Sequence, residues 1–351
     1  MRAAVVHQPG DTPVLEQFTD PQPGPGVSVG ALVAATLNPL DVAFVNDQFP
    51  LRRLQPPCIA GYEAVVQLAD GTRWYVTAPP SPYGTLAELV PVPDSDAFPV
   101  PAGLDPALAA ALGVAGTAGW LALDYRAHLQ PGETVLVLGA GGSAGRLAVQ
   151  SARALGASLV VGAARRKDSS QAADLGADAV VDLADEQATD AGLAAAAPGG
   201  YDVIVDFLWG GVAPHAMNHA KRGARYVQVG NAAGATSTIT GLVLRNKLLT
   251  LVGHSLFATP PSCAGPPTRD SQATRSTASS PWIWSRPGWK TSSGPGSTSR
   301  PVHHANSWSR PDQLEDVAVR CVHPLAHARL SSRTGITRIP AVWRAYSAKP
   351  G

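Results

Sequence analysis

The clearest pattern of apolar and polar positions lies in the middle of the chain. Residues 134–138 (TVLVL) form an unbroken apolar run, which is typical of a parallel strand buried on both faces of a sheet. Another apolar run begins at Leu159. Between them, apolar residues recur at the spacing of a helix that Gly156 would end: Leu147, Val149, Ala152 and Leu155. The pattern predicts a strand, a glycine-rich turn, a helix and a second strand, which together make a βαβ unit.

The flanking regions extend this pattern in both directions. Further strands are expected within 175–182, 201–208, 224–230 and 247–255, so the chain is predicted to be α/β with a doubly wound parallel sheet. Before this region, residues 1–112 are rich in Pro, Gly and short β-like runs. They predict a separate, largely antiparallel β domain ahead of a nucleotide-binding domain over 113–261.

The pattern breaks near Pro261. Residues 262–351 hold 15 Ser, three Leu, four acidic residues and five of the eight Trp, with no sustained helical or strand period. A disordered Ser/Pro/Arg tail is one interpretation, although such tails are usually poor in Trp. Reading a GC-rich back-translation one nucleotide earlier instead gives amphipathic helical and strand-like segments. We therefore predict an aberrant tail that results from a −1 change of reading frame.

Composition excludes several other classes of protein. The 351 residues carry a net charge of +1, which gives no electrostatic reason to bind nucleic acid or a membrane surface. Three cysteines (Cys58, Cys263 and Cys321) cannot form a disulfide framework. The longest apolar runs fall short of the about 18 residues of a membrane span, and the N-terminus lacks the apolar core of a signal peptide. We expect a reduced, cytoplasmic protein.

The glycine turn suggests a specific ligand. A dinucleotide pyrophosphate approaches the backbone closely at a helix N-terminus, where a Cβ would intrude. Gly139, Gly142 and Gly145 fit a GxxGxxG spacing, and a GxGxxA spacing also fits. Two alternatives are a merely flexible loop and a hydrolase nucleophile at Ser143, because GGSAG also fits G-x-S-x-G. The repeated strands that follow favour the dinucleotide.

The residues after the next strand bear on the choice of cofactor. NAD sites usually place an acidic residue about 20 residues past the glycines, where it binds the ribose 2′-hydroxyl. Here Arg165, Arg166 and Lys167 stand at that point, and they would attract the 2′-phosphate of NADPH. A solvated basic loop is the alternative. We predict NADPH as the cofactor.

The ordered set of motifs over residues 1–261 resembles the medium-chain dehydrogenase/reductase superfamily. The motifs are the β domain, AALGVAGTAGWLAL (110–123), VLVLGAGGSAG, LGADAVVD, YDVIVD, RYVQVGNAAG and LLTLVGHSLF. They look most like its zinc-independent quinone oxidoreductase branch, the zeta-crystallin-like enzymes. The resemblance implies a GroES-like β-rich catalytic domain followed by a Rossmann NADP-binding domain, with the nicotinamide in a cleft between them.

The resemblance also argues against zinc. Zinc alcohol dehydrogenases of this superfamily usually have a Cys ahead of an Asp in an early loop and a later Gly-His-Glu. Here these positions read Asn38-Pro-Leu-Asp41 and Gly61-Tyr62-Glu63, and Asn and Tyr are poor zinc ligands. His215 and His219 have a metal-like spacing, but a surface helix pair is the favoured interpretation, and no metal site is predicted.

Asn38 and Asp41, in a motif similar to the branch's NPxD, are expected to line the cleft near the nicotinamide. A structural turn is the alternative, because Asn-Pro favours turns and Asp caps helices. Tyr62 either donates a hydrogen bond to a substrate carbonyl or simply packs, and Tyr83 is a weaker candidate. Asn38 and Tyr62 are the two candidate donors to the substrate oxygen, and Asn38, Asp41 and Tyr62 are the predicted catalytic residues. The predicted cofactor contacts are Thr117, Gly139, Ala140, Gly142, Ser143, Ala144, Gly145, Arg165, Arg166, Lys167, Gly230 and Asn231.

These features predict a zinc-independent, NADPH-dependent oxidoreductase that reduces a quinone or an activated alkene or carbonyl. The alternative is a catalytically inactive nucleotide-binding protein, because the C-terminal part of the family fold is missing from the sequence as written. The resemblance also implies a homodimer if that C-terminus were intact. For the chain as written, we expect poor solubility and little activity.

Overall fold

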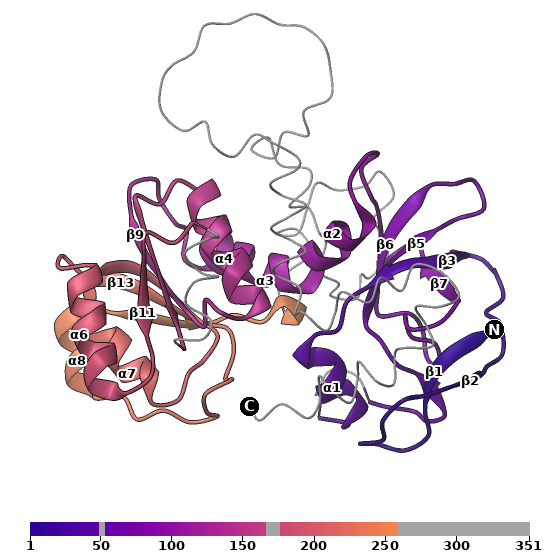
Figure 1. Ribbon diagram of the computed structural model, residues 1–351, viewed down its shortest axis with the longest axis horizontal. Helices are drawn as coiled ribbons and strands as arrows, with labels where there is room; N and C mark the ends of the chain where they lie inside the picture. Colours follow the sequence, from indigo (N-terminus) through magenta and orange to yellow (C-terminus); the bar gives the residue numbers. More distant parts are fainter. Residues whose placement is uncertain (49–52, 166–175, 259–351) are drawn as a thin grey trace, which may run out of the picture. The chain divides into compact units, whose positions relative to one another are not determined.

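The computed structural model describes residues 1–48, 53–165 and 176–258 (Figure 1). The chain divides into two compact units, with the division between Leu112 and Gly113. We call the described residues up to Leu112 the N-terminal unit and those from Gly113 to Ala258 the nucleotide unit. The predicted residues Arg166 and Lys167, and the whole of the predicted aberrant tail, lie outside the described residues.

The N-terminal unit is built from two antiparallel sheets, as the β-like runs predicted. Strands β2 (Val14–Gln17), β1 (Arg2–Val6) and β4 (Cys58–Ile59) form a three-stranded sheet in that order. The five-stranded sheet has the order β7-β3-β5-β6-β8, with these bounds: Leu89–Pro93, Val27–Ala35, Glu63–Gln67, Arg73–Thr77 and Ala97–Pro99. Two helices, α1 (Pro39–Val45) and α2 (Pro106–Ala111), complete the described part of this unit.

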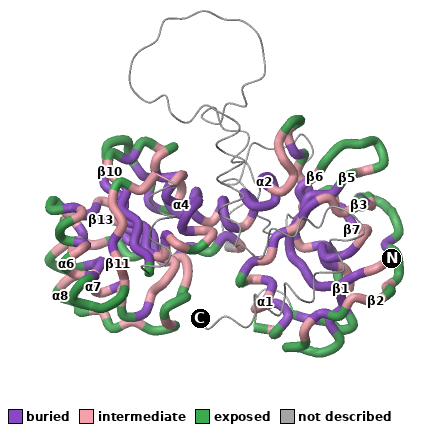
Figure 2. The backbone as a smooth tube through the Cα atoms, viewed as in Figure 1, coloured by how far each residue is buried: buried purple, intermediate pink, exposed green. Residues whose placement is uncertain are grey.

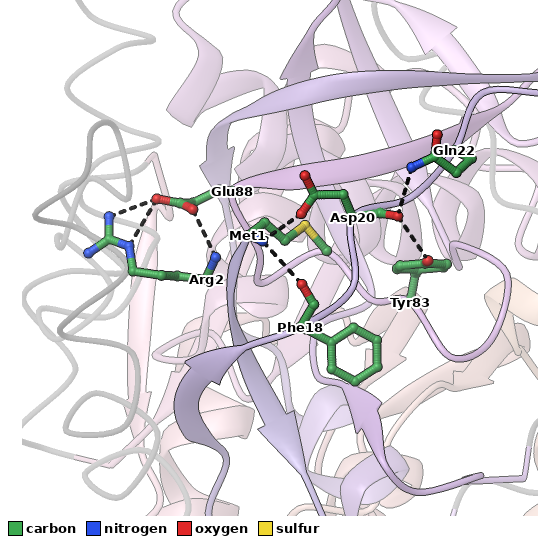
Figure 3. Close-up of polar contacts among 7 residues, drawn as sticks. All are labelled: Met1, Arg2, Phe18, Asp20, Gln22, Tyr83 and Glu88. Carbon is green, nitrogen blue, oxygen red and sulfur yellow. Dashed lines mark hydrogen bonds and ion pairs between the residues drawn. The ribbon is translucent and has the colours of Figure 1, made fainter.

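Both faces of the five-stranded sheet carry buried clusters, and alternate side chains along each strand contribute to one or the other. Val65 and Tyr75 pack on one face with α2, whereas Val66 and Val76 pack on the other. The strand β1 is anchored at the chain terminus, where the Met1 ammonium donates to Phe18 O at 3.1 Å (Figure 3).

The nucleotide unit contains a six-stranded, all-parallel sheet in the order β11-β10-β9-β12-β13-β14. This is the 3-2-1-4-5-6 strand order of a Rossmann fold, so the predicted α/β class and doubly wound sheet are confirmed. The strands in that order span Ala179–Asp182, Leu159–Ala164, Thr134–Leu138, Tyr201–Asp206, Ala220–Gln228 and Thr250–Gly253.

Helices cover both faces of this sheet (Figure 1). Val135 and Val137 pack in the cluster that includes residues of α4 (Ser143–Ala154), and Leu136 and Leu138 pack in the opposite cluster. That second cluster includes residues of α6 (Glu186–Ala196) and α7 (Val212–Asn218). Figure 2 shows the central strands buried. Burial on both faces explains why β9 is apolar at every position after Thr134.

A helical run precedes the sheet. It contains α3 (Thr117–Leu121) between two π-helical segments, Leu112–Gly116 and Ala122–Arg126, and its path is broken at Gly113. The run Pro106–Arg126 is apolar and long enough to cross a membrane by length and composition. The sequence pattern did not predict such a helix, because no unbroken apolar run reaches the length of a membrane span. Because 78% of its most apolar window is buried inside the protein, it is typical of a core helix.

The last elements of the nucleotide unit are less buried than the others. Helix α8 (Gly241–Lys247) buries no residue, and β14 is the edge strand of the sheet. A short 3₁₀ turn, Leu256–Ala258, ends the described part of the chain.

Candidate functional site: a glycine turn and a buried polar cluster

The predicted glycine turn joins β9 to α4 at the carboxyl edge of the sheet. Gly139 follows β9 with φ +88°, a left-handed conformation that favours glycine. A Cβ on Gly145 would overlap Gly139 O, so the start of α4 can lie this close to the turn only without a side chain there. Gly142 is the N-cap of α4 and has no side chain to cap it.

These features fit an anion. Ser143, Ala144 and Gly145 form the first turn of α4, where backbone N–H groups lack partners within the helix. The helix dipole adds positive potential at the same point. Ala140 is fully buried, and its N–H donates to Ala163 O at 3.0 Å, as the N–H of Gly139 does at 2.9 Å. The turn can therefore hold a pyrophosphate through backbone groups.

Arg146 was not anticipated as a member of this turn. Its side chain is buried, and its Nε donates to Gly141 O at 2.9 Å, which ties the first turn of α4 back to the loop. Helical side chains point toward the N-terminus of their helix, so an Arg directly after the last glycine was the available signal. Thr117, another predicted contact, is buried at the start of α3.

Arg165 lies directly after β10, where it is exposed, and it is the described member of the predicted basic cluster. At the same edge of the sheet, the turn that follows β13 leaves little room for side chains. A Cβ on Gly230 would lie 2.8 Å from Phe207 O, and Asn231 O accepts a hydrogen bond from Gly234 N at 3.0 Å. Gly230 and Asn231 thus form a tight turn after β13.

Asp206, at the end of β12, also went unnoticed in the sequence. Its carboxylate accepts hydrogen bonds from Leu208 N at 2.7 Å, Trp209 N at 2.9 Å and Tyr226 Oη at 2.6 Å. Burial raises the pKa of Asp206, and these donors act in the opposite direction. All of these partners are internal, so Asp206 shapes the loop after β12.

In the N-terminal unit, the structure brings the three predicted catalytic residues together. Asp41 Oδ2 accepts from Asn38 N at 2.7 Å, and Asp41 Oδ1 accepts from Tyr62 N at 2.8 Å. Burial raises the pKa of Asp41 to about 7; the hydrogen bond from Asn38 N opposes this shift, and the charge of Glu63 adds to it. Asp41 therefore links the start of α1 to the segment before β5.

Glu63 is the centre of this group, although it was not among the predicted site residues. Its Oε1 accepts from Thr36 Oγ1 at 2.5 Å and from Asn38 Nδ2 at 2.6 Å, and its Oε2 accepts from the hydroxyl of Tyr75. We call Thr36, Asn38, Asp41, Tyr62, Glu63 and Tyr75 the buried polar cluster. Burial raises the pKa of the Tyr75 hydroxyl, and the charge of Glu63 and the nearby Tyr62 add to this effect.

Two other predicted features lie elsewhere. Tyr83 packs edge to face on Phe18, with ring centroids 6.1 Å apart, and its hydroxyl is 3.5 Å from Asp20 O (Figure 3). His215 and His219 share the carboxylate of Asp190, at 3.5 and 2.9 Å. Within the described ranges, no group of three potential ligands could hold a metal.

Known dehydrogenases and oxidoreductases resemble this chain in sequence and in fold. A family model described as zinc-binding dehydrogenase matches residues 144–263. The solved quinone oxidoreductase of Thermus thermophilus, also determined as its complex with NADPH, is 33% identical with a TM-score of 0.63, over 73% of this chain and 81% of that one. The chain belongs to the medium-chain dehydrogenase/reductase superfamily. Within that superfamily, it belongs to the quinone oxidoreductase branch.

Curated members of the superfamily match more locally. A protein of Emericella nidulans described as a probable NADPH-dependent quinone reductase is 36% identical over 168 residues, 46% of each chain. The chloroplastic NADPH-dependent alkenal/one oxidoreductase of Arabidopsis thaliana is 29% identical over 57% of this chain and 54% of its own length. The chain thus matches about half the length of these relatives.

The donor set in this superfamily member does not fit a catalytic zinc ion. At the positions of the family's Cys and His ligands stand an amide, Asn38, and a phenol, Tyr62. The nearby carboxylates of Asp41 and Glu63 already accept internal hydrogen bonds at 2.8 Å or less from the cluster. A zinc ion would have to displace several of these bonds.

Proposed function

We propose that the protein is a zinc-independent, NADPH-dependent oxidoreductase that reduces a quinone or an activated alkene or carbonyl. The observation that carries this proposal is the glycine turn between β9 and α4, at the switch point of a 3-2-1-4-5-6 sheet. Similarity to a quinone oxidoreductase solved with NADPH supports the same reaction class.

The chain's own residues would bind and orient the cofactor. The N–H groups at the start of α4 would receive the pyrophosphate, and Arg146 would hold the turn that presents them. Bound NADPH would supply the hydride. The substrate oxygen then gains negative charge, which a nearby hydrogen-bond donor would stabilise.

We propose different roles for the three catalytic candidates. Asn38 Nδ2 donates to Glu63 and lies 3.4 Å from Thr36 Oγ1, so it can serve a substrate only by leaving an internal partner. Asn38 and Asp41 are therefore positioning residues that fix the backbone of Tyr62. Tyr62, whose backbone N–H donates to Asp41, is our candidate donor to the substrate oxygen.

Arg165 provides a test of cofactor choice. In Arg165→Asp, the new carboxylate would repel the 2′-phosphate, so the ratio of NADPH to NADH affinity should fall about tenfold or more. Arg245→Asp is a matched control, because it makes the same charge change on exposed helix α8. Dissociation constants from nucleotide fluorescence measure both. Equal NADPH and NADH affinities in the unaltered chain would contradict the proposal.

Turnover separates the proposal from an inactive nucleotide-binding protein. NADPH oxidation with a panel of quinones and enones, measured alongside NADPH binding, should show both binding and turnover. Binding without turnover would favour the inactive alternative. We also propose a small-molecule substrate, a cytoplasmic location and, if the family C-terminus were intact, a homodimer. Neither nucleic acid nor a membrane is expected as a partner.

A further inference from the structure

His254 is a buried histidine that the proposed reaction does not use. It directly follows β14, and its backbone N–H donates to Gln228 O at 2.8 Å, which extends the pairing of β14 with β13 by one step. Gln228 is the last residue of β13, so His254 lies at the carboxyl edge of the sheet. Ligands of open α/β sheets bind at this edge.

The imidazole of His254 is unusual because it has no hydrogen-bond partner among the residues that the structure describes. The residue is 6% exposed, and neither Nδ1 nor Nε2 contacts a polar partner there. Buried polar atoms are nearly always paired, and an unpaired one destabilises the fold unless a ligand or water completes it. The two ring nitrogens therefore indicate a missing polar partner.

The charge state of this ring is set by its surroundings. Burial lowers the pKa of His254 to about 4, and the nearby charge of Arg126 acts in the same direction. Arg126 is fixed beside the strand end, because its guanidinium donates to Gly253 O from Nε at 3.1 Å and from Nη2 at 2.5 Å. Near neutral pH the ring is uncharged, with one nitrogen a donor and the other an acceptor.

The strand order indicates which part of a dinucleotide reaches this ring. Each half of a Rossmann sheet takes one mononucleotide, with the pyrophosphate at the switch point. The basic residue Arg165 follows β10, so the adenosine half belongs with β11, β10 and β9. The nicotinamide half belongs with β12, β13 and β14, where His254 lies.

We propose that His254 binds the carboxamide of the nicotinamide, an inference that rests on the proposed function. A primary carboxamide has both an N–H donor and a carbonyl acceptor, so it can pair with a neutral imidazole in either tautomer. A quinone carbonyl can only accept. His254 is thus a residue that fixes the rotation of the nicotinamide ring.

The test compares two ligands on the full chain. His254→Phe keeps a buried ring and removes both nitrogens, so the dissociation constant for NADPH should rise about three- to tenfold. Adenosine 2′,5′-bisphosphate has no nicotinamide, and its affinity should not change. His254→Gln, which can donate and accept, should recover part of the NADPH affinity. His7→Phe, at a half-exposed histidine of the N-terminal unit, is the control.

Each other outcome overturns the inference. Unchanged NADPH affinity in His254→Phe would show that the ring does not contact the cofactor. Equal weakening of both ligands would show that His254 only supports packing of the unit. If the unaltered chain binds adenosine 2′,5′-bisphosphate and NADPH equally well, the nicotinamide adds no affinity and its carboxamide has no partner. That result would overturn the role of His254 but leave the proposed dinucleotide site in place. If it binds neither ligand, the proposed function itself fails, and this inference fails with it.

Discussion

Asp41 combines two opposing influences on one carboxyl group. It is buried, which favours the protonated form, yet both oxygens accept backbone N–H groups, which favour the charged form. With a folded pKa of about 7 against an ordinary value of 3.8, the folded state binds the proton more tightly. The stabilisation is complete below about pH 4 and is lost as the pH rises through 7.

Asp41→Asn should therefore remove the contribution of Asp41 to the pH dependence of the unfolding free energy. Asn keeps one carbonyl oxygen and cannot titrate, so the stability difference between the unaltered chain and the variant should shrink from pH 4 to 7.5, by at most about 1.4 kcal/mol per pH unit. Urea unfolding at several pH values measures it. Asp70→Asn is the control, because hydrogen bonds from Thr72 lower the pKa of exposed Asp70. A pH-independent difference for Asp41→Asn would contradict the assignment.

Only some residues of the buried polar cluster are marked by a sequence motif. The NPxD segment and Tyr62 were selectable because each lies in a recognisable motif. Glu63 was not, since its partners Thr36 and Tyr75 come from distant parts of the chain. The β5–β6 register pairs Val65 with Tyr75, and alternation then puts Glu63 on the face of Tyr75. That register is a tertiary property, which a single sequence does not contain.

Among the elements, the six strands of the nucleotide unit were predictable, including the edge strands β11 and β14, whereas the exposed helix α8 was not. Runs such as TVLVL and YDVIVD are buried on both faces, so their composition alone marks them as β9 and β12. Helix α8 has no buried residue and hence no strong apolar face to detect. Apolar side chains in and beside it remain in solvent, with Leu242 57% and Leu248 55% exposed.

Leu248 carries a second cost, because it ends α8 with φ +48°. A left-handed conformation disfavours a residue with a bulky side chain, whereas Asn tolerates it. Leu248→Asn should therefore raise the unfolding free energy by about 0.5–1 kcal/mol and reduce self-association. Thermal or urea unfolding and sedimentation velocity measure the two effects.

Leu242→Asn is the matched control for this change. The chemical change is the same and the exposure is similar, but Leu242 lies within the helix, where Asn has a lower propensity than Leu. It should reduce self-association as well and leave the stability unchanged or lower it by about 0.5 kcal/mol. If both variants changed stability equally, the left-handed conformation of Leu248 would not be the cause.

Across the whole molecule, the match to the family model and the sequence pattern end at nearly the same place. The family model ends at residue 263, and the match to the Thermus thermophilus enzyme covers 73% of this chain. The change in composition near Pro261 falls at this point. Composition could reveal the break but not its cause, because a disordered tail and a shifted frame both lose apolar periodicity.

The frame-shift hypothesis predicts a gain from recoding residues 262–351. A gene that keeps residues 1–261 and continues in the earlier frame should give a more soluble protein with higher NADPH-dependent quinone reductase activity. The reason is that apolar surface left exposed by a missing segment promotes aggregation. A control gene with synonymous codons that preserve this chain separates the peptide from effects on expression. No gain over that control, or a natural coding sequence with one intact frame and relatives that share the tail, would refute the hypothesis.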